Sequence, residues 1–327
     1  MMEMDKVKIY IAFWAVSIFW GTTYLAIRIG VEVVPPFLFG GIRWIIAGLI
    51  LISYFKFRGH KFPTKGELKN IAVSAAILIG GANSLLIWAE KEIPSGLAAL
   101  IFATFPFWMA GMGAILPHGE KLNPRKLTGI VIGFLGILVL FQADLINLIN
   151  IAYLFGILMV FLAAFAWAVG TLFSKYKFHR SNSMMNVSLQ MLIGGTVQTV
   201  LGISSGELGD LVFTTQGLFA MLYLIVFGSI VGFVAYAYAL ARLSPSTFSM
   251  YGFINPVIAV LLGWAVLGER LDMSVIIATG MILFGIAIVM RNKKADAFIS
   301  TSKQKVSDAE FENYRPEYGR SKSRVNI

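Results

Sequence analysis

Residues 93–122 read IPSGLAALIFATFPFWMAGMGAILPHGEKL, and residues 243–271 read LSPSTFSMYGFINPVIAVLLGWAVLGERL. Each stretch carries a proline inside an apolar run and ends in Gly-Glu-Lys-Leu or Gly-Glu-Arg-Leu. Pro106 falls on Pro256 at an offset of 150 residues, and the Gly-Glu turns match at an offset of 149. Collinear matches with slowly drifting offsets indicate an internal duplication, which must be recognised before any fold is assigned.

The composition is that of a membrane protein. Of 327 residues, 57% are hydrophobic and only 13% are charged, whereas soluble domains are about 25% charged. The run Ile9–Ile27 contains no charge over 19 residues, and Ile71–Ala89 and Ile93–Leu116 are also uncharged. Because about 20 helical residues cross the hydrocarbon core of a bilayer, each of these runs is long enough to span it.

The apolar runs predict ten membrane-spanning segments. Each is expected to be a helix, because backbone polar groups in lipid must be satisfied within their own segment. The predicted spans are residues 9–29, 36–55, 69–90, 94–116, 125–142, 151–173, 184–204, 217–241, 246–267 and 273–291. Five spans fall in each copy, and because five is odd, the second copy must cross the membrane upside down. The predicted fold is an all-α polytopic membrane protein with ten transmembrane helices as two inverted five-helix repeats.

Basic residues in the loops predict the orientation in the membrane. With the N-terminus inside, fourteen Lys and Arg residues lie in inner segments, and only Lys91 and Arg270 lie in outer ones. Since cytoplasmic loops carry an excess of Lys and Arg, both termini are expected in the cytoplasm and the protein in the cell membrane. The predicted organisation is a cytoplasmic N-terminus (1–8), a first repeat (9–142), a second, inverted repeat (151–291) and a basic, disordered cytoplasmic tail (292–327).

The duplicated motif resembles a known family. A mid-span proline, then small and apolar residues, then Gly-Glu-Lys/Arg-Leu, occurring twice in a ten-span chain, is similar to the EamA family of the drug/metabolite transporter superfamily. The likeness covers about residues 10–290. It implies a secondary transporter that exports or exchanges small metabolites such as amino acids. Inverted repeats can rock about a central site, so we expect alternating access about a cavity lined by the first, third, fourth, sixth, eighth and ninth spans.

Two arginines are the charges placed inside predicted spans. Intramembrane ionisable residues are costly and are functional candidates, but a long side chain near a span end can reach the interface. Arg28 lies near an outer end, which favours that interfacial role. Arg43 is deeper and resembles a recurrent arginine of the family's second span, where it could bind a substrate carboxylate or tie helices together. At an offset of 147, Arg28 falls on Lys175 and Arg43 on Gln190.

Carboxylates and histidines are placed at span ends or in loops. A proton-coupled antiporter usually needs a titratable carboxylate or His in its pathway. Glu90, near the outer end of the third span, is the nearest candidate. The sequence therefore favours facilitated diffusion, or exchange driven by the substrate gradient, over proton coupling. Glu120 and Glu269 are interpreted as turn anchors.

Aromatic and amide side chains supply the other candidates. Trp20 and Tyr24 are four residues apart and share a helix face, an arrangement that Trp167 and Thr171 repeat in the second copy. Buried amides in lipid need partners and more often join helices than contact a substrate. Prolines at matching places in two halves can mark a binding site or simply curve the helix. The predicted cavity residues are Trp20, Tyr24, Arg43, Asn83, Trp88, Trp167, Thr171, Gln190, Tyr238, Tyr251 and Asn255, and the predicted helix breaks are Pro106 and Pro256.

Other functions fit the sequence less well. An intramembrane enzyme needs a nucleophile–base pair or a metal cluster, but the chain has no Cys, and its span cores hold no His or carboxylate. No cofactor or metal is expected. A channel-like pore shares the architecture and stays an alternative, although it would normally show a selectivity ring or a charged pore lining. The expected partners are a small-molecule substrate and membrane lipid, and no nucleic acid.

Overall fold

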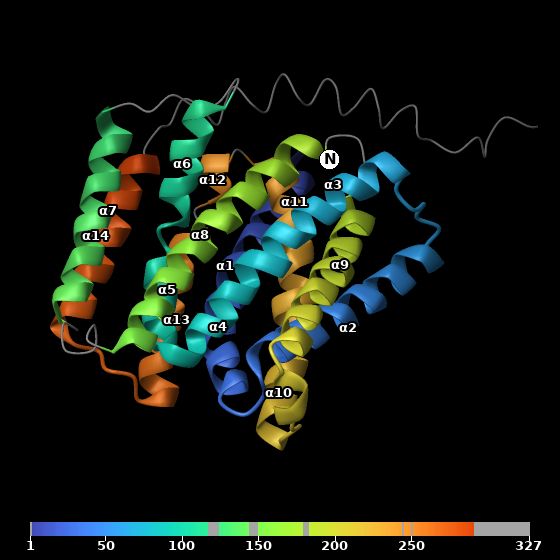
Figure 1. The fold of residues 1–327 in the computed structure, drawn as a ribbon. Coiled ribbons are helices and arrows are strands. Elements are labelled where there is room, and N and C mark those ends of the chain that lie inside the picture. The colour runs from blue at the N-terminus through green and yellow to red at the C-terminus, as the bar shows by residue number, and fades with distance from the viewer. Residues whose placement is uncertain are drawn as a thin grey trace, which may run out of the picture. The chain divides into compact units, whose positions relative to one another are not determined.

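The fold is shown in Figure 1 as a computed structural model, which describes residues 2–116, 124–143, 150–178, 183–243, 245–249 and 251–290. The secondary structure in these ranges is entirely helical. The Gly-Glu-Lys-Leu turn with Glu120, and the tail predicted at 292–327, lie outside the described residues.

Ten apolar helical spans are present in the described part of the chain, seven long and three shorter, which confirms the all-α membrane fold. The first repeat contains α1 (Met2–Val31), α2 (Pro36–Phe57), a third span of α3 (Lys65–Ala75), η1 (Ala76–Asn83) and α4 (Ser84–Glu92), a fourth of α5 (Ser95–Phe102) and α6 (Phe105–Ile115), and α7 (Pro124–Ala143). The second contains α8 (Ile151–Lys177), α9 (Ser183–Ser204), the short η3 (Glu207–Asp210), an eighth span of α10 (Thr215–Tyr223), η4 (Leu224–Val231) and α11 (Gly232–Arg242), a ninth of α12 (Pro245–Phe248) and α13 (Tyr251–Leu267), and α14 (Met273–Met290).

The second spans of the two repeats, α2 and α9, pack against each other in antiparallel directions. Gly41 lies against Gly195 near the start of α2, and Gly48 lies against Leu192 further along it. The missing side chains let the two backbones approach closely, as small residues do between membrane helices. An antiparallel contact between equivalent helices is what an inverted duplication requires.

The fifth spans, α7 and α14, form the same kind of pair. Gly285 lies against the backbone of Gly129 and Gly133, while Gly136 lies against Ala278. The residue numbers of the two helices again run in opposite directions along the contact. The glycine pair of α7 therefore serves close helix packing, and the contact gives a second antiparallel pair of equivalent spans.

A π-helical segment interrupts the third span of each repeat. The segments are η1 and η4, which begin 148 residues apart at Ala76 and Leu224. Nothing in the hydrophobic pattern predicts them. π-helical turns are rare and often occur at functional sites, and here both repeats carry one at the same place.

The fourth spans break at places that differ between the repeats. In the first repeat the break separates α5 from α6, and Pro106 lies in the first turn of α6, where its missing N–H needs no partner. The prediction that Pro256 breaks the ninth span is wrong, because α13 runs without interruption through it. The interruption there lies earlier, between α12 and α13. Membrane helices tolerate an internal proline because neighbouring groups satisfy the freed carbonyl.

The first span of each repeat lies at the interface between the repeats. α1 packs against α11 and α13 of the second repeat, and α8 packs against α4, α5 and α6 of the first. The third and fourth spans therefore contact the first span of the opposite repeat, which brings the first, third, fourth, sixth, eighth and ninth spans around one centre.

Candidate functional site

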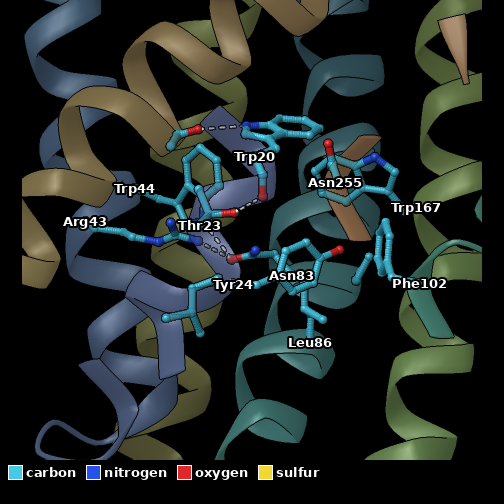
Figure 2. A pocket seen from close by; sticks show the side chains of 13 residues that line it. Trp20, Thr23, Tyr24, Arg43, Trp44, Asn83, Leu86, Phe102, Trp167 and Asn255 are labelled. Carbon is cyan, nitrogen blue, oxygen red and sulfur yellow. Dashed lines mark hydrogen bonds between the residues drawn. The ribbon is translucent and has the colours of Figure 1, made fainter. Parts of the chain in front are cut away.

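A small cavity lies at this centre, and its walls come from both repeats (Figure 2). Its volume is about 50 Å³, whereas one buried water needs about 10–15 Å³ on this measure. The cavity therefore has room for a few waters. Its lining residues are Trp20, Thr23, Tyr24, Ile27, Arg43, Trp44, Ala82, Asn83, Leu86, Phe102, Trp167, Gly228 and Asn255.

Arg43, on α2, is the charged residue of the cavity wall. Its side chain is only 2% exposed. One guanidinium nitrogen, Nη2, donates to Asn83 Oδ1 at 3.1 Å, and the group lies 4.8 Å from the ring centre of Trp44. Nε has no hydrogen-bond partner among the described residues. A buried cation without a carboxylate partner is costly, so this part of the cavity is suited to receive an anion.

Asn83 holds Arg43 and Trp44 in place. Its Oδ1 accepts hydrogen bonds from both Arg43 and Trp44 Nε1, the latter at 2.8 Å. Asn83 is the last residue of η1, so the π-helical segment sets the position of the amide that orients the arginine. One amide thus connects the second and third spans and also lines the cavity.

Two tryptophans from equivalent first spans meet at the cavity. The rings of Trp20 and Trp167 are edge to face, with centres 5.4 Å apart. Trp20 Nε1 donates to the carbonyl of Gly228 in η4 at 3.0 Å, and Trp167 Nε1 donates to the hydroxyl of Tyr251 at 2.9 Å. Both indole N–H groups are hydrogen-bonded, so the remaining, apolar surface of the two rings forms the cavity wall.

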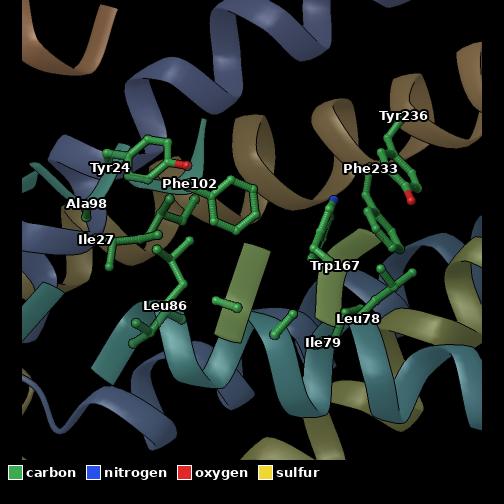
Figure 3. Close-up of a cluster of buried hydrophobic side chains, with 14 of the residues drawn as sticks. Tyr24, Ile27, Leu78, Ile79, Leu86, Ala98, Phe102, Trp167, Phe233 and Tyr236 are labelled. Carbon is green, nitrogen blue, oxygen red and sulfur yellow. The ribbon is translucent and has the colours of Figure 1, made fainter. Parts of the chain in front are cut away.

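Behind these rings lies a layer of buried aromatic side chains (Figure 3). Tyr236 stacks on Phe233 with ring centres 5.1 Å apart, and its hydroxyl is hydrogen-bonded to Thr171 at 2.7 Å. Tyr236 also lies 5.2 Å from Trp20. Phe233 and Tyr236 both belong to α11, so this layer lies behind the cavity wall on the side of α11.

The polar contacts of Arg28, in the last turn of α1, indicate a structural role. Its Nη1 donates to the carbonyls of Glu90 and Lys91 at the end of α4, and its Nε lies 3.6 Å from Glu32. A cation is favourable at a helix C-terminus because the last carbonyls there are unsatisfied.

Lys175, which the duplication pairs with Arg28, does the same in the second repeat. Its Nζ donates to the carbonyls of Leu240 and Leu243 at the end of α11. In both repeats, therefore, a cation of the first span caps the third span. This repeated contact accounts for the charge of Arg28 within a membrane helix.

Glu90, in the last turn of α4, is fully buried. Neither carboxylate oxygen has a hydrogen-bond partner among the residues that the structure describes. Its charge interacts with those of Glu269, Arg28 and Arg43. The sequence placed this residue near a span end, where water would be expected, and did not indicate that the surrounding helices enclose it.

Glu269 lies between α13 and α14 and contacts the N-terminus of α5, which follows the end of α4 that carries Glu90. Its carboxylate accepts hydrogen bonds from the N–H groups of Ser95 and Gly96 at 2.8 and 3.0 Å and from Ser95 Oγ at 2.7 Å. A carboxylate at a helix N-terminus satisfies orphan donors and complements the dipole. This contact, the Glu269 closure, fastens α5 of the first repeat to a loop of the second.

The structure brings together six of the eleven predicted cavity residues in the cavity wall: Trp20, Tyr24, Arg43, Asn83, Trp167 and Asn255. Thr171 and Tyr251 lie one layer behind it through the hydrogen bonds described above.

Three predicted residues lie elsewhere, which corrects their assignment to the wall. Gln190 donates to Ser74 Oγ at 2.8 Å and joins α9 to α3. Tyr238 lies under the guanidinium of Arg242 at 3.6 Å, and Trp88 is half-buried and does not line the cavity. Trp88 is two residues from the wall residue Leu86 and five from Asn83, and residues at such spacings do not share a helix face.

Other wall residues were not predicted. Helical spacing could have indicated three of them, since Thr23 lies three residues after Trp20, Ile27 three after Tyr24 and Leu86 three after Asn83. The remaining wall residues, Trp44, Ala82, Phe102 and Gly228, depend on how the helices rotate. In the described ranges no group of three or more His, Cys, Asp or Glu side chains could hold a metal ion.

Comparison with known sequences identifies two matching regions. The model of the EamA-like transporter family matches residues 7–142 and again residues 154–291. The uncharacterized inner membrane transporter YedA of Escherichia coli K12 is 33% identical over 283 residues, covering 86% of this chain and 90% of the relative. The uncharacterized transporter YoaV of Bacillus subtilis is 26% identical over 284 residues, covering 86% and 96%.

Comparison with solved structures supports the same fold. One crystal structure superposes with a TM-score of 0.65 at 22% sequence identity, covering 86% of this chain and 96% of that one. At this identity the likeness concerns the fold. The two regions that the family model matches coincide with the two halves that the internal duplication defines.

Proposed function

This chain belongs to the EamA-like transporter family, and we propose that it is a secondary transporter that carries a small metabolite with a carboxylate group, such as an amino acid, by alternating access. Family membership makes it a membrane transporter and not an enzyme. The substrate class, the carrier mechanism and the direction of transport, which we propose to be export or exchange, go further than that.

The observation that carries the substrate class is the environment of Arg43. Its guanidinium is buried, lines the central cavity and keeps Nε without a partner among the described residues. A carboxylate can accept two hydrogen bonds from the planar guanidinium fork. The tryptophan walls supply apolar surface for the rest of a small solute, as cavities for small molecules usually combine a few polar groups with aromatic lining.

The small volume of the central cavity favours a carrier over the alternative of a pore. At about 50 Å³ it is far below the roughly 300 Å³ at which sites for drug-sized ligands begin. The aromatic layer lies on one side and the Glu269 closure fastens α5 to the second repeat. We propose that these two contacts open in turn as the two inverted repeats rock about the centre.

The proposed arrangement in the cell follows the basic loops. Residues 9–142 and 151–291 form the two halves in the cytoplasmic membrane, with both termini in the cytoplasm. The Glu269 closure then faces outward and the aromatic layer faces inward. The proposed partners are the solute and membrane lipid. The name of the Escherichia coli relative, an inner membrane transporter, supports this location.

A screen for the exported solute tests the proposal. The metabolites outside cells that overproduce the wild-type chain are compared with those outside cells that overproduce Arg43→Gln at equal abundance. We expect one or a few carboxylate-bearing compounds to accumulate outside with the wild type only. Accumulation of compounds without a carboxylate, to the same level with both variants, would contradict the substrate class.

Counterflow in proteoliposomes then separates a carrier from a pore. Vesicles are loaded with the compound from the screen and mixed with a trace of its labelled form outside. A carrier gives saturable uptake that rises with the internal concentration. Uptake that increases linearly with concentration and shows no stimulation from the opposite side would support the pore instead.

A further inference from the structure

The buried carboxylate of Glu90 has no role in the fold described so far. It is enclosed by the bundle, and neither oxygen accepts a hydrogen bond from a described residue. Burying an ionised carboxylate without hydrogen bonds is strongly unfavourable, and such a group becomes neutral or gains a partner. In the closed structure, a bound proton meets this requirement.

Neighbouring charges do not supply the missing partner. On α1, Arg28 is occupied by backbone carbonyls and Glu32, and Tyr24 interacts with Glu90 only electrostatically. On α2, Arg43 is bonded to Asn83. From the α13–α14 loop, Glu269 adds a like charge. α5 carries no titratable residue, and α8 passes this end of α4 at Gly156, one turn from Tyr153.

The second repeat shows that this position needs no charge for folding. α4 and α11 end alike, since the C-cap residues Ile93 and Leu243 donate their N–H groups to Ala89 and Ala239. This alignment, at an offset of 150 residues, puts Leu240 where the first repeat has Glu90. Leu240 is buried as well. An apolar side chain therefore fills the equivalent place in one repeat, and a carboxylate fills it in the other.

Glu90 is linked by its position to the cavity and by electrostatics to the Glu269 closure. Leu86, one helical turn earlier on α4, lines the cavity, as do Tyr24 and Arg43. Glu90 also interacts electrostatically with Glu269, whose carboxylate forms the Glu269 closure. A change in the charge of Glu90 therefore alters the electrostatic environment of Arg43 in the cavity wall and of the Glu269 closure on α5.

We propose that Glu90 is a proton-binding site that couples solute movement to proton movement. The inference rests on the proposed carrier function. A proton from water adds to a Glu90 carboxylate oxygen when the Glu269 closure is open, and the neutral side chain is enclosed when it closes. When the opposite side opens, the proton leaves to water there. No covalent bond of the solute changes, and one proton is moved in each cycle.

Infrared spectroscopy of the purified, full-length chain tests proton binding without any solute. A protonated carboxyl group gives a C=O band that an ionised one lacks. We expect wild type to show such a band that disappears as the pH is raised, Glu90→Gln to lack it, and Glu92→Gln, two residues further along α4, to keep it. Glu90→Leu copies the second repeat and serves as a second variant if the first does not fold. A band that survives in either folded Glu90 variant overturns the proposal.

A transport measurement tests coupling. Proteoliposomes receive a labelled mixture of the twenty common amino acids, under a pH gradient of one unit. One-to-one coupling at one pH unit corresponds to about tenfold accumulation. We expect about tenfold accumulation with wild type and Glu92→Gln, and equilibration without accumulation with Glu90→Gln, while exchange persists. Exchange without accumulation in the wild type overturns coupling and leaves the carrier function standing. No exchange of any amino acid counts against the proposed substrate class, and the infrared band then decides whether Glu90 binds a proton.

Discussion

Arg28 and Arg43 lie on neighbouring helices of the first repeat, but their surroundings differ. Arg28 is matched in the second repeat by Lys175, and both cap the C-terminal end of a third span. Arg43 is matched by Gln190, which joins two helices and does not line the cavity. Its own guanidinium faces the cavity with an unpartnered Nε, as far as the described residues go.

This difference separates polar residues that stabilise the fold of a duplicated membrane protein from those that serve its function. A polar contact present in both repeats belongs to the fold, because the fold is what the repeats share. A polar residue present in one repeat only, with an incomplete set of partners, belongs to function. Arg43 and Glu90 both satisfy this second description, and both lie in the first repeat.

Replacing Arg43 with glutamine tests this distinction most strongly. The variant copies the second repeat and removes the cation. Because a hydrogen bond to a charged group contributes about 1.5–3 kcal/mol, we expect the KM for the transported solute to rise roughly 10- to 100-fold. Arg43→Lys keeps the charge without the planar fork and should recover part of the loss. An unchanged KM at equal protein abundance would make Arg43 another structural cation.

Removing either central tryptophan should have the next largest effect. Trp20→Ala and Trp167→Ala each take away an aromatic wall, and aromatic contacts contribute about 0.5–1.5 kcal/mol beyond burial. We expect counterflow rates to fall about 3- to 10-fold. Trp167→Phe keeps a ring but loses the bond to Tyr251, and its loss should be smaller. Normal kinetics in both alanine variants, with expression preserved, would remove these residues from the site.

Arg28→Gln and Lys175→Gln should behave alike, since they remove equivalent helix caps. A cation at a helix C-terminus contributes about 0.3–1 kcal/mol, so the thermal unfolding midpoint should fall by roughly 2 °C. The KM should stay within about twofold of wild type. A much larger change in KM for Arg28→Gln than for Lys175→Gln would show that the two caps are not equivalent.

The smallest effect is expected from Gln190→Met. This change removes one hydrogen bond between helices, to Ser74, and such bonds in membranes average about 0.6 kcal/mol. Transport kinetics should be unchanged and the thermal midpoint should fall by only about 1 °C. A loss of transport as large as that of Arg43→Gln would refute the assignment of these two matched positions to different roles.

Much of the fold could be predicted from the sequence, because spans are encoded by runs of apolar residues. The predicted 36–55 and 184–204 differ by one or two residues at their ends from α2 and α9. The internal duplication also predicted the matching of Arg28 with Lys175. These features depend on local hydrophobicity and on spacing along the chain, which a single sequence contains.

The site was predicted only in part, because burial depends on which helices surround a residue. Glu90 lies in the last turn of a span, where sequence alone favours contact with water, but the packing of the surrounding helices buries it completely. Trp44 and Phe102 line the cavity through the rotation of their helices. The π-helical segments arise from a shift in backbone hydrogen bonding, to which the hydrophobic pattern is insensitive.

These two π-helical segments have a mechanical consequence. Each holds a wider turn of backbone in the middle of its span, and a return to ordinary α-helical bonding would rotate everything beyond it about the helix axis. In the first repeat, the part that turns carries Asn83 at its start and Glu90 near its end. A rotation in the first repeat would therefore move Asn83, which orients Arg43, and Glu90 together.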